Sequence, residues 1–270
     1  MIYRLRVAGV KYGAIALTNL QNQLAYVWDA LNRAFLILLF MFIFAQLWRV
    51  AFAAQGVTEI AGMTLADTIW YFLIAEVMQL GQIRHDVNIT QEVKDGSIAY
   101  TIGKPYNYLV YHFSNGLGES ALRMSLIFLL GAPVALYYAG IPTLSLLHLP
   151  FVFGILFIAI LVDFCILSVI GLLAFITEDT SSFRLIYQKI TFILGGLLIP
   201  LDFLPEWLQR VAGLLPFQLT AYAPARLFVA FSWSQFWQLL VSGLIWLAIL
   251  GLILWRQYRW ATRRLAINGG

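Results

Sequence analysis

The sequence predicts an all-α membrane protein, a single domain covering residues 1–270 with six transmembrane helices. Two observations support this prediction. Hydrophobic residues make up 61% of the chain and charged residues 11%, whereas soluble domains have about 45–50% and about 25%. Six separate apolar runs are also long enough to cross a membrane, which takes roughly 20 helical residues. The lone Cys165 lies inside one of these runs, so no intrachain disulfide is expected.

Residues 2–25 precede the first apolar run and predict an amphipathic helix. Apolar residues recur there at spacings of three and four, with Arg4, Arg6 and Lys11 among them. This pattern is typical of a helix that lies in the headgroup layer of a membrane. The alternative is that the helix extends the first span into the cytosol.

The six apolar runs give the approximate bounds of the spans. They are 34–53, 65–83, 121–139, 149–176, 183–200 and 236–255.

Basic residues predict how the spans are oriented, because cytoplasmic loops are enriched in Lys and Arg. Six spans place both termini on one side, and a cytoplasmic location of that side puts 14 of the 17 basic residues inside. The 14 are Arg4, Arg6, Lys11, Arg33, Arg84, Lys94, Lys104, Arg123, Arg184, Lys189, Arg256, Arg259, Arg263 and Arg264. Only Arg49, Arg210 and Arg226 are left outside. The expected location is the bacterial plasma (inner) membrane, with several passes.

Residues 84–106 form a cytoplasmic loop that is too charged to lie in hydrocarbon. Asn88 or Thr90 can cap a helix there, and the Asp95-Gly96 pair can end it. We interpret this short helix as a part that presses on a separate motor subunit.

Residues 201–235 form an external loop that is unusually apolar. Pro205 fits the first turn of a helix, with Glu206 near its positive end, and Pro216 and Pro224 break the apolar stretch after it. Such a loop is expected to dip back into the outer leaflet as short re-entrant helices buried against protein. The candidate residues for this region and an outer gate are Gly195, Gly196, Pro200, Pro205, Trp207 and Pro216. A plain helix terminus at Gly195-Gly196 is the alternative.

Two acidic residues, Glu76 and Asp163, lie within predicted spans. An intramembrane carboxylate is costly and usually has a partner or a task. The functional interpretation is a substrate-facing or proton-linked group, and the structural one is a hydrogen bond to a neighbouring helix or subunit. No phosphate-binding loop, catalytic motif or cluster of metal ligands is recognisable in the sequence. No metal site is therefore expected. Binding of nucleic acid is not expected either, because the basic residues cluster at the ends of apolar runs.

Two stretches resemble a known family. The run GGLLIPLDFLPEWLQRVAGLLPF, residues 195–217, resembles the signature of type-2 ATP-binding-cassette (ABC) transporter permeases. The run QEVKDGSIAYTIGKPYNYLVY, residues 91–111, is similar to the cytoplasmic loop of one branch of that family. Thr101-Ile102-Gly103 departs from that branch, which usually has leucines there. The resemblance extends over the whole chain in the number of spans and the placement of loops.

The resemblance implies a permease subunit without enzymatic activity. It would pair with a second copy or a related permease and bind two separate ABC ATPase subunits, which would hold ATP and Mg, so no cofactor is expected in this chain. The residues implied to form the coupling helix are Asn88, Thr90, Gln91, Glu92, Lys94, Asp95 and Gly96. A Glu92→Lys change is expected to leave the chain folded and to uncouple or detach the ATPase.

The function expected from the sequence is thus export of a lipid, hydrophobic or amphiphilic substrate, powered by a partner. One alternative is a proton-coupled secondary transporter that uses Glu76 or Asp163. Six spans without an internal repeat fit poorly with the inverted halves of such carriers. Another alternative is a membrane enzyme acting on lipid. The sequence argues against it, because it shows no recognisable set of catalytic residues.

Overall fold

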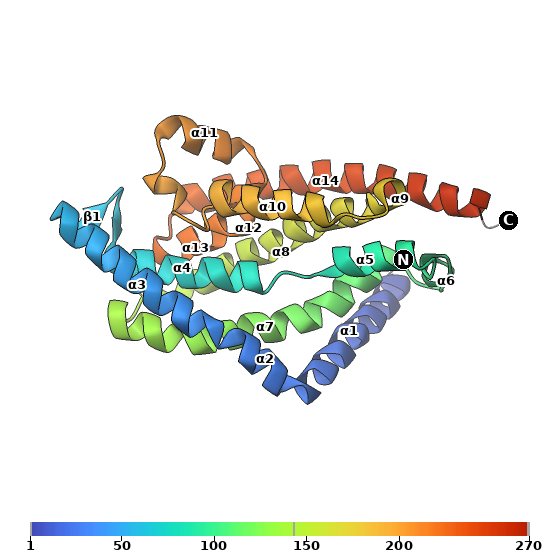
Figure 1. Cartoon of the computed structure of the whole chain (residues 1–270), viewed down its shortest axis with the longest axis horizontal. Coiled ribbons are helices and arrows are strands. Elements are labelled where there is room, and N and C mark those ends of the chain that lie inside the picture. The colour runs from blue at the N-terminus through green and yellow to red at the C-terminus, as the bar shows by residue number, and fades with distance from the viewer. Residues whose placement is uncertain (1, 143, 269–270) are drawn as a thin grey trace.

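The computed structural model describes residues 2–142 and 144–268, and their side chains except those of residues 2–6, 8, 30, 33 and 264–268. The side chains of Arg4, Arg6, Arg33 and Arg264, which counted toward the predicted orientation, lie outside the described residues. The chain is mostly helical, and its long helices run roughly along one axis (Figure 1).

The first part of the chain forms four helices and one hairpin. They are α1 (Ile2–Ala25), α2 (Val27–Ala34), α3 (Leu36–Gln55), β1 (Glu59–Ile60), β2 (Met63–Thr64) and α4 (Leu65–Leu80). The two strands pair antiparallel around Ala61 and Gly62, which both have positive φ, as a tight hairpin turn requires. Thr64 then caps α4 through a reciprocal capping box with Asp67.

The middle of the chain carries the long connection between α4 and the next long helix. Its elements are α5 (His85–Lys94), α6 (Ile98–Ile102), α7 (Tyr108–Ala139), η1 (Leu146–His148), α8 (Leu149–Leu172) and α9 (Ala174–Thr177). The α7 helix begins well before the predicted start at residue 121. Asn107 caps it by accepting a hydrogen bond from the Val110 amide, and the polar run from 115 to 123 continues the helix.

The last part of the chain completes the fold. Its elements are α10 (Ser181–Leu194), η2 (Leu201–Phe203), α11 (Glu206–Leu214), α12 (Phe217–Thr220), α13 (Tyr222–Val229) and α14 (Trp233–Asn268). Pro205 and Pro216 directly precede α11 and α12. Pro224, in contrast, does not break the chain as predicted. It lies in the first turn of α13, where its missing N–H leaves no helical hydrogen bond unmade.

Four helical segments in the described part of the chain are long and apolar enough to cross a membrane. They are Leu36–Gln55, Tyr108–Ala139, Leu146–Thr177 and Trp233–Arg263. The protein is therefore a multi-pass membrane protein. The two other predicted spans correspond to α4 and α10, which have 16 and 14 residues and run beside the long helices (Figure 1). They end at Gly81 and Gly195, so a layout of six full spans stays a prediction.

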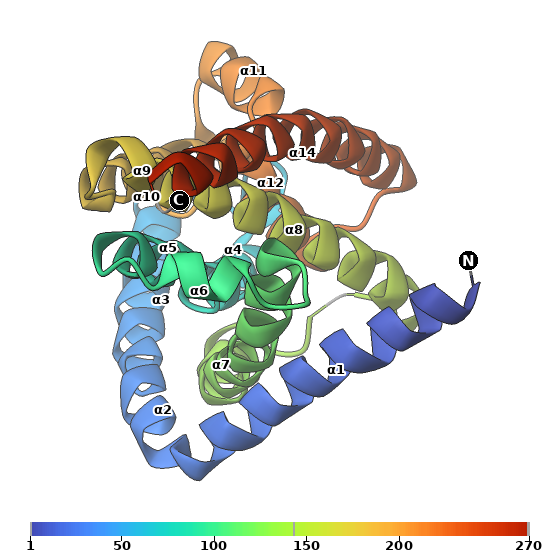
Figure 2. The ribbon, with the colours of Figure 1, turned by 90° about the vertical axis from the view of Figure 1, so that its right-hand side faces the viewer.

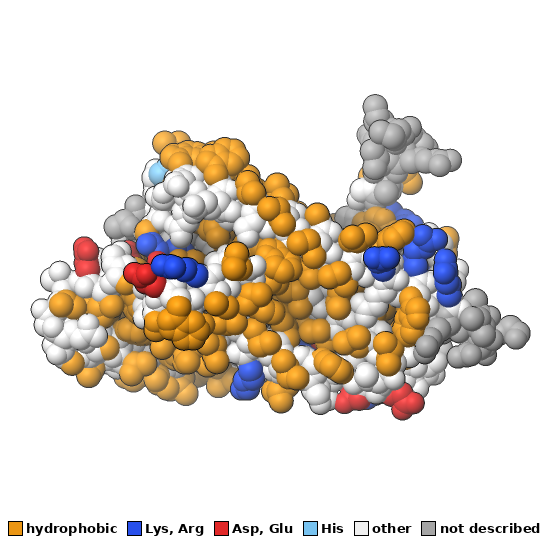
Figure 3. All heavy atoms as spheres, turned by 90° about the horizontal axis from the view of Figure 1, so that it is seen from above, with side chains coloured by type: hydrophobic (Ala, Val, Ile, Leu, Met, Phe, Trp, Pro, Cys, Tyr) orange, Lys and Arg blue, Asp and Glu red, His pale blue; other side chains and the backbone are white. Residues whose placement is uncertain are grey.

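One end of the molecule carries α5, α6, α9 and both ends of the chain, and the opposite end carries the hairpin and α11 (Figure 1). Hydrophobic side chains cover the middle of the face in Figure 3, and the charged side chains on that face lie mostly toward its two ends. This distribution fits a membrane-embedded middle with two wet ends.

The α1 helix lies across the long helices, as the end-on view shows (Figure 2). It packs against α7, where Asn19 donates a 3.0 Å hydrogen bond to Asn115. Gly118 permits the approach, since a Cβ there would lie 2.2 Å from the carbonyl oxygen of Ala16. Val10 and Leu17 stay more than half exposed. The predicted helix is confirmed, and its place in the headgroup layer stays a prediction.

The re-entrant prediction covers α11 and the two helices after it, α12 and α13. Of the side chains of α11, only Ala212 is buried, and Trp207 and Leu214 are exposed. The α12 and α13 helices are short and mostly buried, and a re-entrant course of the loop stays a prediction. The α13 helix packs against both α4 and α8, and α12 packs against α8 and α10. Leu219, Ala223 and Leu227 share one hydrophobic cluster with residues of α8 and α14. Two short helices thus fill the space between long ones at the end opposite α5.

Candidate functional site

The α5 helix starts one turn earlier than the sequence suggests. Arg84 occupies the N-cap position without a side-chain hydrogen bond, so the prediction that Asn88 or Thr90 caps the helix is wrong. The reason is that the buried ring of His85 already anchors the first turn. Its Nδ1 lies 3.1 Å from the carbonyl oxygen of Ile83, and its Nε2 lies 2.7 Å from Ser168 Oγ. The end of the helix is as predicted, with Gly96 at φ +77° after Asp95.

The inward face of α5 is tied to the α8–α10 region. Asp86, with a side chain only 1% exposed, forms a 3.1 Å ion pair with Arg184 of α10. Thr90 is also buried, and its hydroxyl lies 2.6 Å from that of Thr180, just before α10. Ile89 packs with Leu172 in a cluster of its own. Thr90 therefore holds α5 in place and presents no surface to a partner.

Burial shifts the pKa values of the two acid–base groups in the first turn of α5. It lowers the pKa of His85 to about 3, so the ring is neutral. The carbonyl of Ile83 then accepts from Nδ1–H, and Nε2 accepts from the Ser168 hydroxyl. Burial also raises the pKa of Asp86, and the guanidinium of Arg184 opposes that rise.

Glu92 faces the interior at the end of α5. Its Oε2 accepts 2.9 Å hydrogen bonds from the hydroxyls of Thr101 and Tyr108, and its Oε1 lies 3.6 Å from His112 Nε2. The side chain is 20% exposed. Glu92 therefore joins α5 to α6 and α7, and its carboxylate is already engaged within the chain.

Lys94 and Asp179 form a 3.0 Å ion pair between α5 and the turn after α9, with both side chains about half exposed. The pKa of Asp179 is lowered by a hydrogen bond from Ser181 and then by Lys94. Exposed pairs of this kind contribute little to stability. The pair nevertheless places the turn 177–180 beside the last turn of α5, on the same end of the molecule.

The outward face of α5 is a mostly polar stripe, which we call the α5 stripe. Its members recur at three- and four-residue spacing and are all exposed: Arg84, Val87, Asn88, Gln91, Lys94 and Asp95. The opposite face is fixed to α7, α8 and α10 by the contacts above. A force applied to the stripe would therefore reach α7, α8 and α10 at once.

Gly195 and Gly196, the predicted gate residues, lie where three elements meet. Tyr71 of α4 donates a 2.6 Å hydrogen bond to the carbonyl oxygen of Gly196, and the Tyr222 amide of α13 donates to that of Gly195. Gly196 has φ +75°. Pro200, four residues after Gly196, is buried and directly precedes η2. Trp207 is 66% exposed. The structure thus brings together the glycines but not Trp207.

A second set of contacts in this region was not predicted. Arg226 of α13 forms a 3.3 Å ion pair with Asp202 of η2, and the Tyr222 hydroxyl donates to the same carboxylate at 3.2 Å. The sequence feature that could have revealed this ion pair is Arg226 itself, a basic residue inside an apolar stretch that is predicted to lie on the external side. Its acidic partner lies 24 positions earlier, and spacing alone does not reveal the pairing.

The two acidic residues of the predicted spans have different surroundings. Asp163 accepts hydrogen bonds from Gln82 at 3.0 Å and from the Tyr187 hydroxyl at 2.5 Å. It therefore links α8 to α10 and to the segment before α5. Glu76 is buried in α4, 5% exposed. The structure does not bring the two carboxylates into one site.

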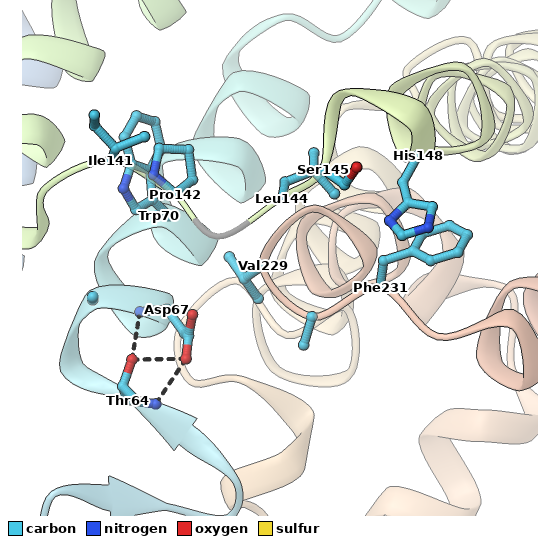
Figure 4. A pocket seen from close by; sticks show the side chains of 12 residues that line it. Thr64, Asp67, Trp70, Ile141, Pro142, Leu144, Ser145, His148, Val229 and Phe231 are labelled. Atoms are coloured by element: carbon cyan, nitrogen blue, oxygen red, sulfur yellow. Dashed lines mark hydrogen bonds between the residues drawn. The ribbon is translucent and has the colours of Figure 1, made fainter.

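A cavity of about 440 Å³ opens at the end opposite α5, between the start of α4, the loop before α8 and the end of α13 (Figure 4). Asp67 and Thr64 face it but bond each other, with 2.7 Å between the hydroxyl and the carboxylate. His148 stacks on Phe231 on the far side, with 4.0 Å between ring centroids. These groups are used within the fold and assemble no catalytic set. Among the described residues, no group of His, Cys, Asp and Glu is placed to hold a metal ion.

Comparison with known families gives one match. Residues 23–269 match the family model described as ABC-2 family transporter protein. A search among curated proteins finds no match. The matched range includes the α5 stripe and the Gly195-Gly196 junction.

Proposed function

Because this chain belongs to the ABC-2 transporter family, we propose that it is the membrane subunit of an ATP-driven exporter that takes its energy through α5. Membrane subunits of this family are transport subunits that partner with ABC ATPases and are not themselves catalytic. The finer steps of the proposal are the coupling role of α5, the direction of transport and the class of substrate.

The arrangement of α5 is the observation that carries the proposal. Its outer face is the exposed α5 stripe, and its inner face is bonded to its neighbours through Asp86, Thr90 and Glu92. A helix with these two faces suits the transfer of motion from an aqueous partner to the membrane. In this proposal the ATPase contacts the exposed residues Asn88, Gln91, Lys94 and Asp95. Thr90 and Glu92 transmit the motion to the neighbouring helices, and Gly96 marks the end of α5.

The remaining parts of the assembly belong to the same proposal. Two ATPase subunits hold ATP and Mg, and two permeases, identical or related, face each other across apolar helix surfaces. Exposed apolar side chains on α3 and α10, among them Phe42, Leu47, Ile186 and Ile193, are available for such a contact. Both termini lie in the cytoplasm of a bacterial cell, on the α5 side of the plasma membrane. The substrate moves along the interface and is lipid-like, hydrophobic or amphiphilic.

We propose that the carboxylate of Asp163 is structural, which argues against Asp163 as the proton site of the proton-coupled alternative. Gln82 and Tyr187 both donate to the same oxygen of this carboxylate and belong to other segments of the chain. A proton-carrying group needs access to water in at least one state, and Asp163 is 5% exposed.

The experiment is purification of the tagged chain from its own membrane, followed by mass measurement of the intact complex. We expect a nucleotide-hydrolysing subunit to copurify. Gln91→Arg on the α5 stripe should leave the chain folded but reduce the amount of that subunit and the transport rate. Gln55→Arg, at the opposite end of the molecule, is the matched control. Absence of any ATPase, or full coupling in Gln91→Arg, would overturn the proposal.

A further inference from the structure

Two cavities meet on one side of α7, near the end of the molecule that carries α5. The first has a volume of about 500 Å³ and lies between α7, α10 and the first turn of α5 with the segment before it. The second, of about 250 Å³, lies between α7, the end of α4 and the corner where α1, α2 and α3 follow one another. Arg84, Glu119 and Arg123 line both cavities. The two spaces are therefore neighbours that share one wall.

A single stripe of α7 runs along both cavities and changes character along its length. In chain order it consists of His112, Asn115, Gly116, Glu119, Arg123 and Ile127. Residues at this spacing share one helix face. The stripe is polar as far as Arg123 and apolar at Ile127, where Leu36 and Leu80 line the same space. The polar cavity thus continues into an apolar one.

The length of this path matches a lipid. Ile127 lies 12 positions after Asn115, which is roughly 18 Å along an α-helix. Half of a bilayer, headgroup included, measures about 20 Å. A molecule with a polar head and an acyl chain could therefore lie along α7, with its head in the first cavity.

The charges of the first cavity favour an anion. Three guanidinium groups line it, those of Arg84, Arg123 and Arg184. Arg184 is paired with Asp86 at 3.1 Å and Arg123 with Glu119 at 3.5 Å. Three positive groups against two carboxylates leave one positive charge in excess. Guanidinium groups bind phosphate through several N–H donors, and Asn115 and Gln188 add amide groups to the wall.

We propose that these paired cavities bind a glycerophospholipid whose headgroup carries one net negative charge. Its phosphate lies among Arg84, Arg184 and the amide groups, and an acyl chain lies beside Leu36, Leu80 and Ile127. Because Arg84 is the N-cap residue of α5, the bound lipid ties the start of α5 to α7 and α10. This inference stands whether or not α5 contacts an ATPase, and it assigns a resident ligand, not the transported substrate.

The test uses the full chain, purified in neutral detergent and freed of lipid. Phosphatidylglycerol and phosphatidylcholine with identical chains are titrated separately, and bound lipid is counted by native mass spectrometry. We expect phosphatidylglycerol to bind at least about fivefold more tightly, the factor that corresponds to about 1 kcal/mol for one basic residue near an anionic lipid.

Two variants should move the affinity in opposite directions. Arg84→Gln should weaken phosphatidylglycerol binding about fivefold, and Glu119→Gln should strengthen it by a similar factor because it removes the carboxylate that lines both cavities. Binding of phosphatidylcholine should change in neither variant. Arg256→Gln, an exposed basic residue on α14, is the matched control for nonspecific attraction. Equal thermal midpoints of the lipid-free variants would show that each one is folded.

Three results would overturn the proposal. Equal affinity for the two lipids would remove the role of the headgroup charge. Unchanged binding in both Arg84→Gln and Glu119→Gln would place the lipid elsewhere on the chain. Full displacement of phosphatidylglycerol by millimolar inorganic phosphate would show a site for free anions, to which the apolar cavity contributes nothing.

Discussion

The hydroxyl of Tyr71 donates a 2.6 Å hydrogen bond to the carbonyl oxygen of Gly196, 125 residues later in the chain. Both groups are buried, and a Cβ on Gly196 would lie 2.5 Å from that hydroxyl oxygen. The bond fixes the end of α10 to the middle of α4. Together with the Tyr222 amide bond to Gly195, it ties the end of α10 to the start of α13.

The first prediction concerns this junction. Tyr71→Phe should lower the free energy of unfolding by about 1–2 kcal/mol, because a buried carbonyl loses its partner. Gly196→Ala should cost more, since it adds a steric clash to the strain of a positive φ. Thermal unfolding in detergent, followed by tryptophan fluorescence, measures both. Gly213→Ala is the control, because a Cβ there meets nothing within 4 Å, and a large loss in it would show that the effect is not specific.

The second prediction concerns Glu92, and it changes the expectation drawn from the sequence. Glu92→Lys should lower the thermal midpoint, because an ammonium group would replace the acceptor of the Thr101 and Tyr108 hydroxyls. Glu92→Gln keeps an acceptor oxygen and should stay close to the parent chain. The comparison is with Glu59→Lys, an exposed position on β1. If Glu92→Lys unfolds at the parent temperature, the inward contacts of Glu92 carry no stability.

The third prediction concerns the ion pair beneath α5. Arg184→Gln should destabilise the chain by about 3 kcal/mol, because it leaves the buried carboxylate of Asp86 without its countercharge. The double variant Asp86→Asn with Arg184→Gln should lose less than the sum of the two single variants. Chemical denaturation of all four proteins in mixed micelles gives the coupling energy. Arg210→Gln, which breaks an exposed pair on α11, should cost under about 1 kcal/mol.

The fourth prediction concerns the contribution of His85 to stability in mild acid. The folded pKa of His85, about 3, lies below its ordinary value of 6.5. Between these values the unfolded chain binds a proton that the folded chain does not. The contribution of His85 to stability is therefore complete above pH 6.5 and falls as the pH decreases, by up to about 1.4 kcal/mol per unit. The raised pKa of Asp86 acts in the opposite direction at lower pH.

His85→Gln isolates this contribution, because an amide can bond Ser168 but does not titrate. Thermal midpoints are measured from about pH 7.5 to about pH 5. The difference between the parent chain and this variant should shift against the parent as the pH decreases. His148→Gln, at the other end of the molecule, is the control for the loss of a histidine ring elsewhere in the fold. An identical slope in His85→Gln would assign the acid sensitivity to other groups.

Much of the fold was predictable because it depends on local pattern. Length and apolar composition located the long helices, and Asp95-Gly96 marked the end of α5 correctly. The start of α5 was not predictable from local signals. Asn88 is a good capping residue by type, but the anchor of the first turn is the contact between His85 and Ser168, which lie 83 residues apart.

The candidate sites divide along the same line. The sequence singled out Gly195-Gly196 from a local pattern, and the structure places both glycines at a junction of α4, α10 and α13. The sequence did not identify Tyr71 or Asp202. Their roles come only from partners far along the chain, which no local pattern reveals. Thr90 and Glu92 were correctly placed on a helix, yet which face they occupy depended on packing against α7 and α10.

The seam between α1 and α7 has a consequence for any motion of the protein. At Gly118 the two backbones touch without a side chain between them. Lys11 also donates a hydrogen bond to the carbonyl oxygen of Pro105, in the segment just before α7. Neither helix can slide past the other without opening that seam. Any tilt of α7 would therefore have to carry α1 with it, and the medium around α1 would resist that motion.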